Sequence, residues 1–158
     1  MSEQIELFVN GEEHYVTIDC NDMLIDVLRD QLGLKGAKIG CDRNVCGACT
    51  VLVNGDPMAA CSTFAWRTDG ARIVTIEGLA GEDGALDPVQ QAFHDTGALQ
   101  CGYCTPGMIL LAKSLLDRNP NPDRNEITDW MGANICRCTG YKMIIDAVEL
   151  AVPKGDGA

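Results

Sequence analysis

Eight of the nine cysteines in this chain fall into two sets of four, and their spacing limits what the chain can fold around. The first set has the spacing C-x4-C-x2-C-x11-C and consists of Cys41, Cys46, Cys49 and Cys61. Its first three members match the plant-type iron-sulfur spacing, in which a fourth cysteine follows later in the chain. A loop that wraps an inorganic core needs small residues and backbone amides directed at the sulfurs, which suits Gly40, Gly47 and Ala48. The spacing therefore predicts an iron-sulfur site.

The second set lies in the second half of the chain, as the pairs CGYC and CRC separated by 31 residues. Its members are Cys101, Cys104, Cys136 and Cys138. Each pair is predicted in a loop between two helices, so a helical bundle would bring the four thiolates together at one end. Cys104 and Cys138 each precede a threonine that can cap a helix, Thr105 and Thr139. Two helix N-termini are then expected to face the bound cluster, because helix dipoles favour an anion there.

Other uses of the cysteines are less consistent with the spacing. Two zinc sites would need the same eight thiolates, but structural zinc usually draws on paired C-x2-C knuckles. Disulfides conflict with a reducing compartment and with the closeness of Cys136 and Cys138 in the chain. The ninth cysteine, Cys20, ends a predicted strand, and we expect it to be a small buried hydrophobe.

The first half of the chain has the pattern of a small sheet. Apolar and polar residues alternate over 5–9, and a second run over 15–18 follows the turn Asn10-Gly11, which predicts a hairpin. Further strands are expected over 50–53 and 72–76. Together these runs predict a sheet of four or five strands over one helix.

That helix is predicted over residues 23–32, where leucine and isoleucine recur at helical spacing. Asn21 or Asp22 is available as its N-cap, and Gly33 follows its last residue. The segment GLAGEDGALD at 78–87 has no such periodicity and is the predicted linker.

The second half is predicted to be a four-helix bundle. Its helices are expected to begin near Asp87, Thr105, Asp123 and Tyr141. Asp87 precedes a proline at the first helical position, and Asp123 is followed three residues later by Glu126, as in a capping box. The predicted domains are therefore residues 1–77 and 88–158, joined by the linker 78–87.

Charge excludes some partners. Asp and Glu outnumber Lys and Arg by 23 to 12, a formal charge of −11, which argues against nucleic acid and anionic membrane surfaces. No apolar run approaches the roughly 20 residues of a spanning helix. The start at residues 1–5 has neither a basic segment nor a signal-type apolar stretch, so a cytoplasmic location without a membrane span is expected.

The combination of GCDRNVCGACTV, QCGYCTPGMI and NICRCTGY resembles the small iron-sulfur subunit of the molybdenum hydroxylases, the xanthine oxidase family. The resemblance extends from about Ile5 to about Val152. It implies an α+β fold, with an N-terminal β-grasp ferredoxin-like domain and a C-terminal four-helix bundle, each holding one 2Fe-2S cluster. Similar subunits assemble with a large subunit that carries molybdopterin cytosine dinucleotide and, commonly, a medium subunit that carries FAD. A dimer of heterotrimers is the implied assembly.

The resemblance also implies roles for single residues. The first cysteine set would hold the cluster nearer FAD and the second set the cluster nearer molybdenum. Gln100, just before the C-x2-C pair, would contact the pterin, and Cys138 would approach it. One departure is Asn44, where many relatives have glycine; Asn tolerates a left-handed backbone better than most residues, so the loop is expected to keep its course.

The predicted function is that of an electron-transfer subunit of an oxidoreductase complex, with the substrate site on another chain. The alternatives are a free-standing ferredoxin-like carrier and a zinc-binding structural module. Similar small subunits serve enzymes that act on N-heterocycles, aldehydes, carbon monoxide or aromatic CoA thioesters. Nothing in this sequence selects among these substrates.

Overall fold

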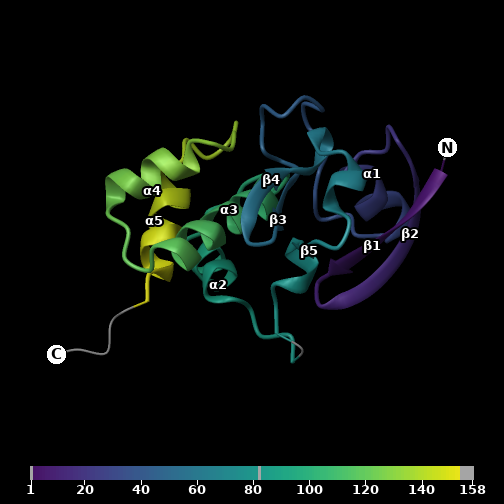
Figure 1. Cartoon of the computed structure of the whole chain (residues 1–158). Coiled ribbons are helices and arrows are strands. Elements are labelled where there is room, and N and C mark those ends of the chain that lie inside the picture. The colour runs from purple at the N-terminus through teal and green to yellow at the C-terminus, as the bar shows by residue number, and fades with distance from the viewer. Residues whose placement is uncertain (1, 82, 154–158) are drawn as a thin grey trace.

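The strands lie in one half of the molecule together with one short helix, and the four longer helices form the other half (Figure 1). The computed structural model describes residues 2–81 and 83–153, so Glu82 of the predicted linker and residues 154–158 of the predicted helical domain lie outside the described residues. All five strands precede the four long helices in the chain. This order confirms the predicted α+β class.

The first half is built on one five-stranded sheet with the order β2-β1-β5-β3-β4. Its strands are β1 (Ser2–Val9), β2 (Glu12–Asp19), β3 (Thr50–Val53), β4 (Asp56–Ala59) and β5 (Arg72–Val74). β1 is antiparallel to β2 and parallel to β5, and β3 is antiparallel to both of its neighbours. The hairpin pairs Ile5 with Val16, and its turn places Asn10 and Gly11 at positive φ, 54° and 88°. The predicted hairpin is confirmed.

The predicted helix begins at α1 (Leu24–Asp26) and continues as a π-helical turn, η1 (Val27–Gln31). The predicted caps Asn21 and Asp22 are wrong, because Met23 is the N-cap and no side chain caps this described segment. Met23 forms a β-bridge with Phe64, which sets the entry of the chain into the helix. The Asp22 carboxylate instead accepts a hydrogen bond from the backbone N–H of Asp19, at 2.9 Å.

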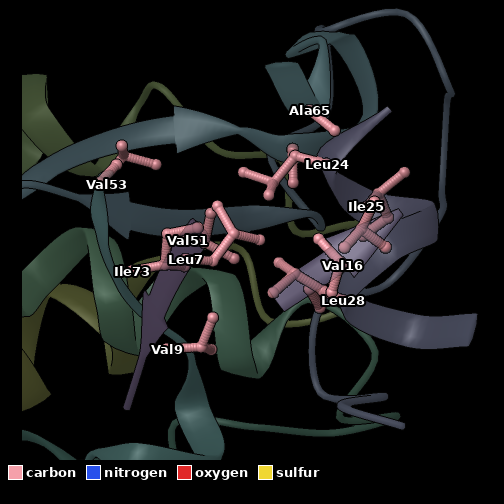
Figure 2. Packing of buried hydrophobic residues seen from close by; sticks show 14 of the residues in the cluster. Leu7, Val9, Val16, Leu24, Ile25, Leu28, Val51, Val53, Ala65 and Ile73 are labelled. Carbon is pink, nitrogen blue, oxygen red and sulfur yellow. The ribbon is translucent and has the colours of Figure 1, made fainter. Parts of the chain in front are cut away.

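The first hydrophobic core lies between the sheet and this helix (Figure 2). Leu7 and Val51 from the strands meet Leu24 and Leu28 from the helical segment, and all four side chains are fully buried. Three short 3-10 turns complete this half: η2 (Ala60–Ser62), η3 (Ala65–Thr68) and η4 (Ile76–Gly78).

The second half consists of four helices, as predicted: α2 (Pro88–Asp95), α3 (Thr105–Arg118), α4 (Arg124–Met131) and α5 (Lys142–Ala151). Asp87 caps α2 in a capping box with Gln90, and the Asp123 carboxylate accepts the backbone N–H of Glu126 at 2.8 Å. A second core forms between the helices around the fully buried Phe93. No helix in residues 2–81 and 83–153 is long and apolar enough to cross a membrane.

The two halves meet where α3 packs against β3 and β4. Arg118 at the end of α3 forms an ion pair with Asp56 at the start of β4. The cysteine-bearing loops therefore lie on parts of the chain that pack against each other.

Cys20 corrects one expectation. It is exposed rather than buried, because β2 ends at Asp19 and Cys20 belongs to the turn that follows. In the sequence it lies outside both sets of four.

Candidate metal centres

The first cysteine set is held mainly by one tightly wound loop, residues 40–49. Asp42 and Asn44 adopt left-handed backbone angles, with φ of 55° and 54°. This winding lets the backbone N–H groups of Val45 and Cys46 both donate to the Sγ of Cys41, at 3.3 Å each. The expectation for Asn44 is confirmed, whereas the left-handed Asp42 was not predicted.

Electrostatics differ sharply within this set. Hydrogen bonds from the backbone, first from Val45 and then from Arg43 and Cys46, lower the pKa of Cys41 to about 6. Burial raises the pKa of Cys49 to about 12. The loop thus favours a thiolate at its outer end and surrounds the inner thiol with apolar protein.

The thiols of the first set approach each other in two pairs. Cys41 interacts with Cys46 inside the loop. Cys49, which directly precedes β3, interacts with Cys61 of η2, the turn that follows β4, and both thiols are buried. The fourth cysteine is therefore delivered by the β3–β4 hairpin.

The second set is assembled from two separate loops. Cys101 and Cys104 lie between α2 and α3, and Cys136 and Cys138 lie between α4 and α5. The Sγ atoms of Cys101 and Cys138 are 3.7 Å apart, and the thiols of Cys104 and Cys136 also interact. This set again forms two pairs, and each pair joins one thiol from each loop.

The surroundings of Cys136 and Cys104 differ. Burial raises the pKa of Cys136, but the Thr139 hydroxyl, which lies 3.1 Å from Sγ, and the backbone N–H groups of Thr139 and Cys138 outweigh it and lower the pKa. Burial and the neighbouring Cys136 raise the pKa of Cys104 to about 12. The Tyr141 hydroxyl accepts the Cys136 backbone N–H at 2.9 Å and donates to the Asn134 carbonyl at 3.0 Å.

The expected threonine caps are wrong. Thr105 is the first residue of α3, with Cys104 at the N-cap position, and Thr139 lies before the N-cap of α5, which is the left-handed Tyr141. Neither helix has a side-chain cap within residues 83–153. Of these two helices, only α3 directly follows a cysteine of the second set. In the α4–α5 loop, the Thr139 hydroxyl donates to the Cys136 thiol instead of capping α5.

Six of the eight thiols line one cavity of about 320 Å³, which Tyr103 and Ile135 also border. Within the described ranges, no three His, Cys, Asp or Glu side chains converge as a site for a single metal ion. A two-iron cluster with four cysteine ligands takes two thiolates on each iron. The arrangement of the thiols in pairs matches that donor set.

One end of the second set is open to solvent. Gln100, Cys101 and Cys138 are exposed. Leu99 and Ile135 beside them are 45% and 47% exposed, and the exposed Tyr103 lines the same cavity as Ile135, so large apolar side chains gather at this end. This end has the composition of a surface that another protein or cofactor covers.

Sequence reasoning missed several residues that connect the two sets. The Tyr103 hydroxyl donates to the Ile39 carbonyl at 2.8 Å, and the Ile135 N–H donates to the Cys46 carbonyl at 2.9 Å. The side chain of Asn134 is buried between the two halves. Closeness to the cysteines in the chain was the one available signal, because these contacts depend on tertiary packing.

Comparisons with known proteins agree with this geometry. A family model described as a 2Fe-2S iron-sulfur cluster binding domain matches residues 9–90, and one described as a [2Fe-2S] binding domain matches residues 75–149. The nicotinate dehydrogenase small FeS subunit of Eubacterium barkeri is 51% identical over 95% of each chain. The nicotine 6-hydroxylase small subunit of Paenarthrobacter nicotinovorans is 45% identical, over 92% of this chain and 87% of that one.

Solved structures show the same fold. Quinoline 2-oxidoreductase from Pseudomonas putida contains a chain that superimposes with a TM-score of 0.89 and 44% identity, over 95% of this chain and 94% of that chain. The aldehyde oxidoreductase of Desulfovibrio desulfuricans superimposes with a TM-score of 0.91 and 46% identity, over 95% of this chain but only 17% of that longer one. Together with two cluster-binding domains in one chain, these relatives place the protein: it belongs to the small 2Fe-2S subunits of the molybdenum hydroxylases and is an iron-sulfur electron-transfer subunit of an oxidoreductase complex.

Proposed function

We propose that the two cysteine sets hold one 2Fe-2S cluster each, and that the clusters relay electrons between a molybdopterin site and FAD on partner subunits. The observation that carries this proposal is the convergence of the thiols within each set, as in the second set, where the Sγ atoms of Cys101 and Cys138 are 3.7 Å apart. One iron of the first cluster would take Cys41 with Cys46, and the other Cys49 with Cys61. In the second cluster the pairs would be Cys101 with Cys138 and Cys104 with Cys136.

A bound 2Fe-2S cluster supplies one-electron transfer. The residues of this chain hold it and set its environment. Backbone N–H groups directed at Cys41, and the Thr139 hydroxyl at Cys136, stabilise negative charge on the sulfurs. The buried thiols of Cys49 and Cys61 keep water from the inner face of the first site.

The exposed end of the second set supports contact with a molybdopterin cytosine dinucleotide on a large subunit. Gln100 and Cys138 are both exposed there, as a contact with a partner's cofactor requires. The exposed apolar residues Leu99 and Ile135 fit burial under that partner.

Local charge supports an FAD-bearing medium subunit beside the first set. Residues 35–75 contain five basic and three acidic side chains, although the whole chain has a formal charge of −11. This segment is therefore less acidic than the rest of the chain, which would lessen repulsion of an acidic partner. We propose domain limits of 1–77 and 88–158 with the linker 78–87, assembly as a dimer of heterotrimers, and a cytoplasmic location.

The substrate belongs to the partner chain. The relatives are named for nicotinate, nicotine, caffeine and aldehydes. Small subunits with similar sequences therefore serve enzymes with different substrates, which is consistent with a shared role in electron transfer.

Metal analysis of the assembled complex tests the ligand assignment. Iron and acid-labile sulfide should each approach about four per copy of this chain. The Cys46→Ser and Cys136→Ser variants should each lose about half of this iron and one electron paramagnetic resonance signal, because each removes a thiolate from a different cluster. Cys20→Ser is the matched control and should keep all of it, since Cys20 lies outside both sets. Zinc at about two per chain without sulfide would instead establish a structural zinc module.

The contact of Gln100 with the pterin has its own test. Gln100→Ala should slow reduction of the clusters by substrate while leaving dithionite reduction and iron content unchanged. Gln4→Ala, an exposed glutamine of β1, should leave both rates at the wild-type value. Equal rates in Gln100→Ala and wild type would remove Gln100 from the electron route.

A further inference from the structure

A buried amide lies at the junction of the two cysteine-bearing halves. Asn134 follows α4 and is only 4% exposed. Its Nδ2 donates to the carbonyl of Gly107 in α3 at 3.1 Å and to the Thr50 hydroxyl of β3 at 3.2 Å. The Thr50 hydroxyl in turn donates to the Gly47 carbonyl at 2.7 Å. One side chain thus connects a strand of the first half, a helix of the second half and the loop of the first cysteine set.

Two glycines allow these segments to approach so closely. A Cβ on Gly47 would lie 1.6 Å from Oδ1 of Asn134, and a Cβ on Gly107 would lie 2.4 Å from the Gly47 carbonyl oxygen. Real side-chain atoms do not come this close. The contact therefore requires hydrogen at both positions, and any added atom would separate α3 from the loop.

The bonded residues are chain neighbours of the proposed ligands. Gly47 follows Cys46, and Asn134 lies two residues before Cys136. A backbone hydrogen bond also joins the two segments: the Ile135 N–H donates to the Cys46 carbonyl at 2.9 Å. The junction thus holds one proposed ligand of each cluster at a set separation.

We propose that Asn134 is a positioning residue that sets the separation of the two clusters and so their electronic coupling. The inference rests on the proposed ligand assignment. Electron transfer between fixed centres slows steeply with distance, and the magnetic interaction between two reduced clusters falls with the cube of their separation. A buried amide bonded to both halves resists small shifts, because leaving its partners unpaired is costly.

The test compares Asn134→Asp with wild type in the assembled complex. A carboxylate has the same shape but cannot donate, and it would face the Gly107 carbonyl with negative charge. We expect iron to stay near four per chain while the magnetic interaction between the reduced clusters weakens and transfer between them slows by about tenfold or more. Asn125→Asp, an exposed position on α4, adds the same charge and should change neither quantity.

The outcomes separate this inference from the proposed function. A wild-type complex without iron and sulfide would end the ligand assignment and this inference with it. A fully loaded Asn134→Asp complex with the wild-type magnetic interaction and transfer rate would overturn the positioning role alone. Should Asn134→Asp lose iron, the milder Thr50→Val variant decides the question: it removes the hydroxyl between Asn134 and Gly47 at nearly constant shape, and an unchanged interaction there would also overturn the role.

Discussion

The two cysteine sites differ in how the chain builds them. Three thiols of the first site come from the single loop 40–49, whose left-handed residues Asp42 and Asn44 direct backbone amides at Cys41. The second site takes two thiols from each of two loops that are separated by helices α3 and α4. Local backbone conformation therefore shapes most of the first site, whereas only the packing of four helices can complete the second.

Burial follows the same division. Cys49 and Cys61 belong to the first hydrophobic core, so the sheet holds them in place. In the second site Cys136 alone is buried, and Cys101 and Cys138 are exposed. We infer that the second site depends more on its cluster and on a covering partner for its stability.

The largest expected effect comes from Cys104→Ser. Each half is small, so a cluster that crosslinks two loops contributes much of the stability of the helical half. Amide exchange in residues 88–151 should rise by at least about ten-thousandfold, equivalent to about 5.5 kcal/mol of opening free energy, and much less in residues 2–76. A rise mainly in residues 2–76 would mean that the sites are assigned to the wrong halves.

Truncation of the two cores comes next. Phe93→Ala should lower the free energy of unfolding by about 3–5 kcal/mol and Leu28→Ala by about 2–5 kcal/mol, because both side chains are fully buried. Denaturant titration with amide exchange should show loosening first in the half that carries the substitution. Leu86→Ala, at a 46% exposed position, serves as control and should stay within about 0.5 kcal/mol of wild type. Identical exchange profiles for the two core variants would show that the halves unfold as one unit.

Asn44→Ala tests the local part of the comparison. Asn44 has φ of 54°, where alanine is disfavoured by about 1 kcal/mol and glycine is not. Thermal unfolding of the loaded protein should show this loss for Asn44→Ala and none for Asn44→Gly. Equal stability of the two variants would contradict the view that backbone conformation shapes the first loop.

The smallest effect concerns an exposed ion pair in the helical half. Hydrogen bonds from Lys142 and then Arg124 hold the pKa of Asp146 below its usual value. Because the folded-state pKa is lowered, this contribution to stability is present above the ordinary Asp value of about 3.9 and is lost as pH falls through the lowered pKa. Asp146→Asn should therefore flatten the acid side of the stability profile slightly, and salt should reduce the difference.

Melting temperatures recorded across that acid range provide the measurement. Asp129→Asn, an exposed carboxylate on α4, is the comparison variant. If it flattened the profile as much as Asp146→Asn, the effect would come from net charge rather than from this ion pair.

Much of the fold was predictable because the signals are local. The Asn10-Gly11 turn specified the hairpin, and Asp87 and Asp123 marked helix starts that the structure confirms. Each of these signals acts over a few residues, so the turn and the helix starts can be predicted from the nearby sequence.

The wrong predictions concerned polar side chains that bind a different nearby group from the expected one, or small shifts in an element's end. Asp22 does not cap the first helix because the preceding strand uses its carboxylate. Thr139 binds the Cys136 thiol instead of capping α5. Cys20 is exposed because β2 ends one residue earlier than its pattern indicated.

The sequence by itself determined the type of chemistry, because the spacing of eight thiols and the identity of their neighbours are properties of the chain. Tertiary structure decided which thiols pair, since Cys101 meets Cys138 only when two helix-connecting loops pack together. It also decided the junction at Asn134, where the chain packs so closely around Gly47 and Gly107 that a Cβ at either position would clash. Spacing along a chain restricts which atoms can meet, but the distance between two sites depends on how the halves pack.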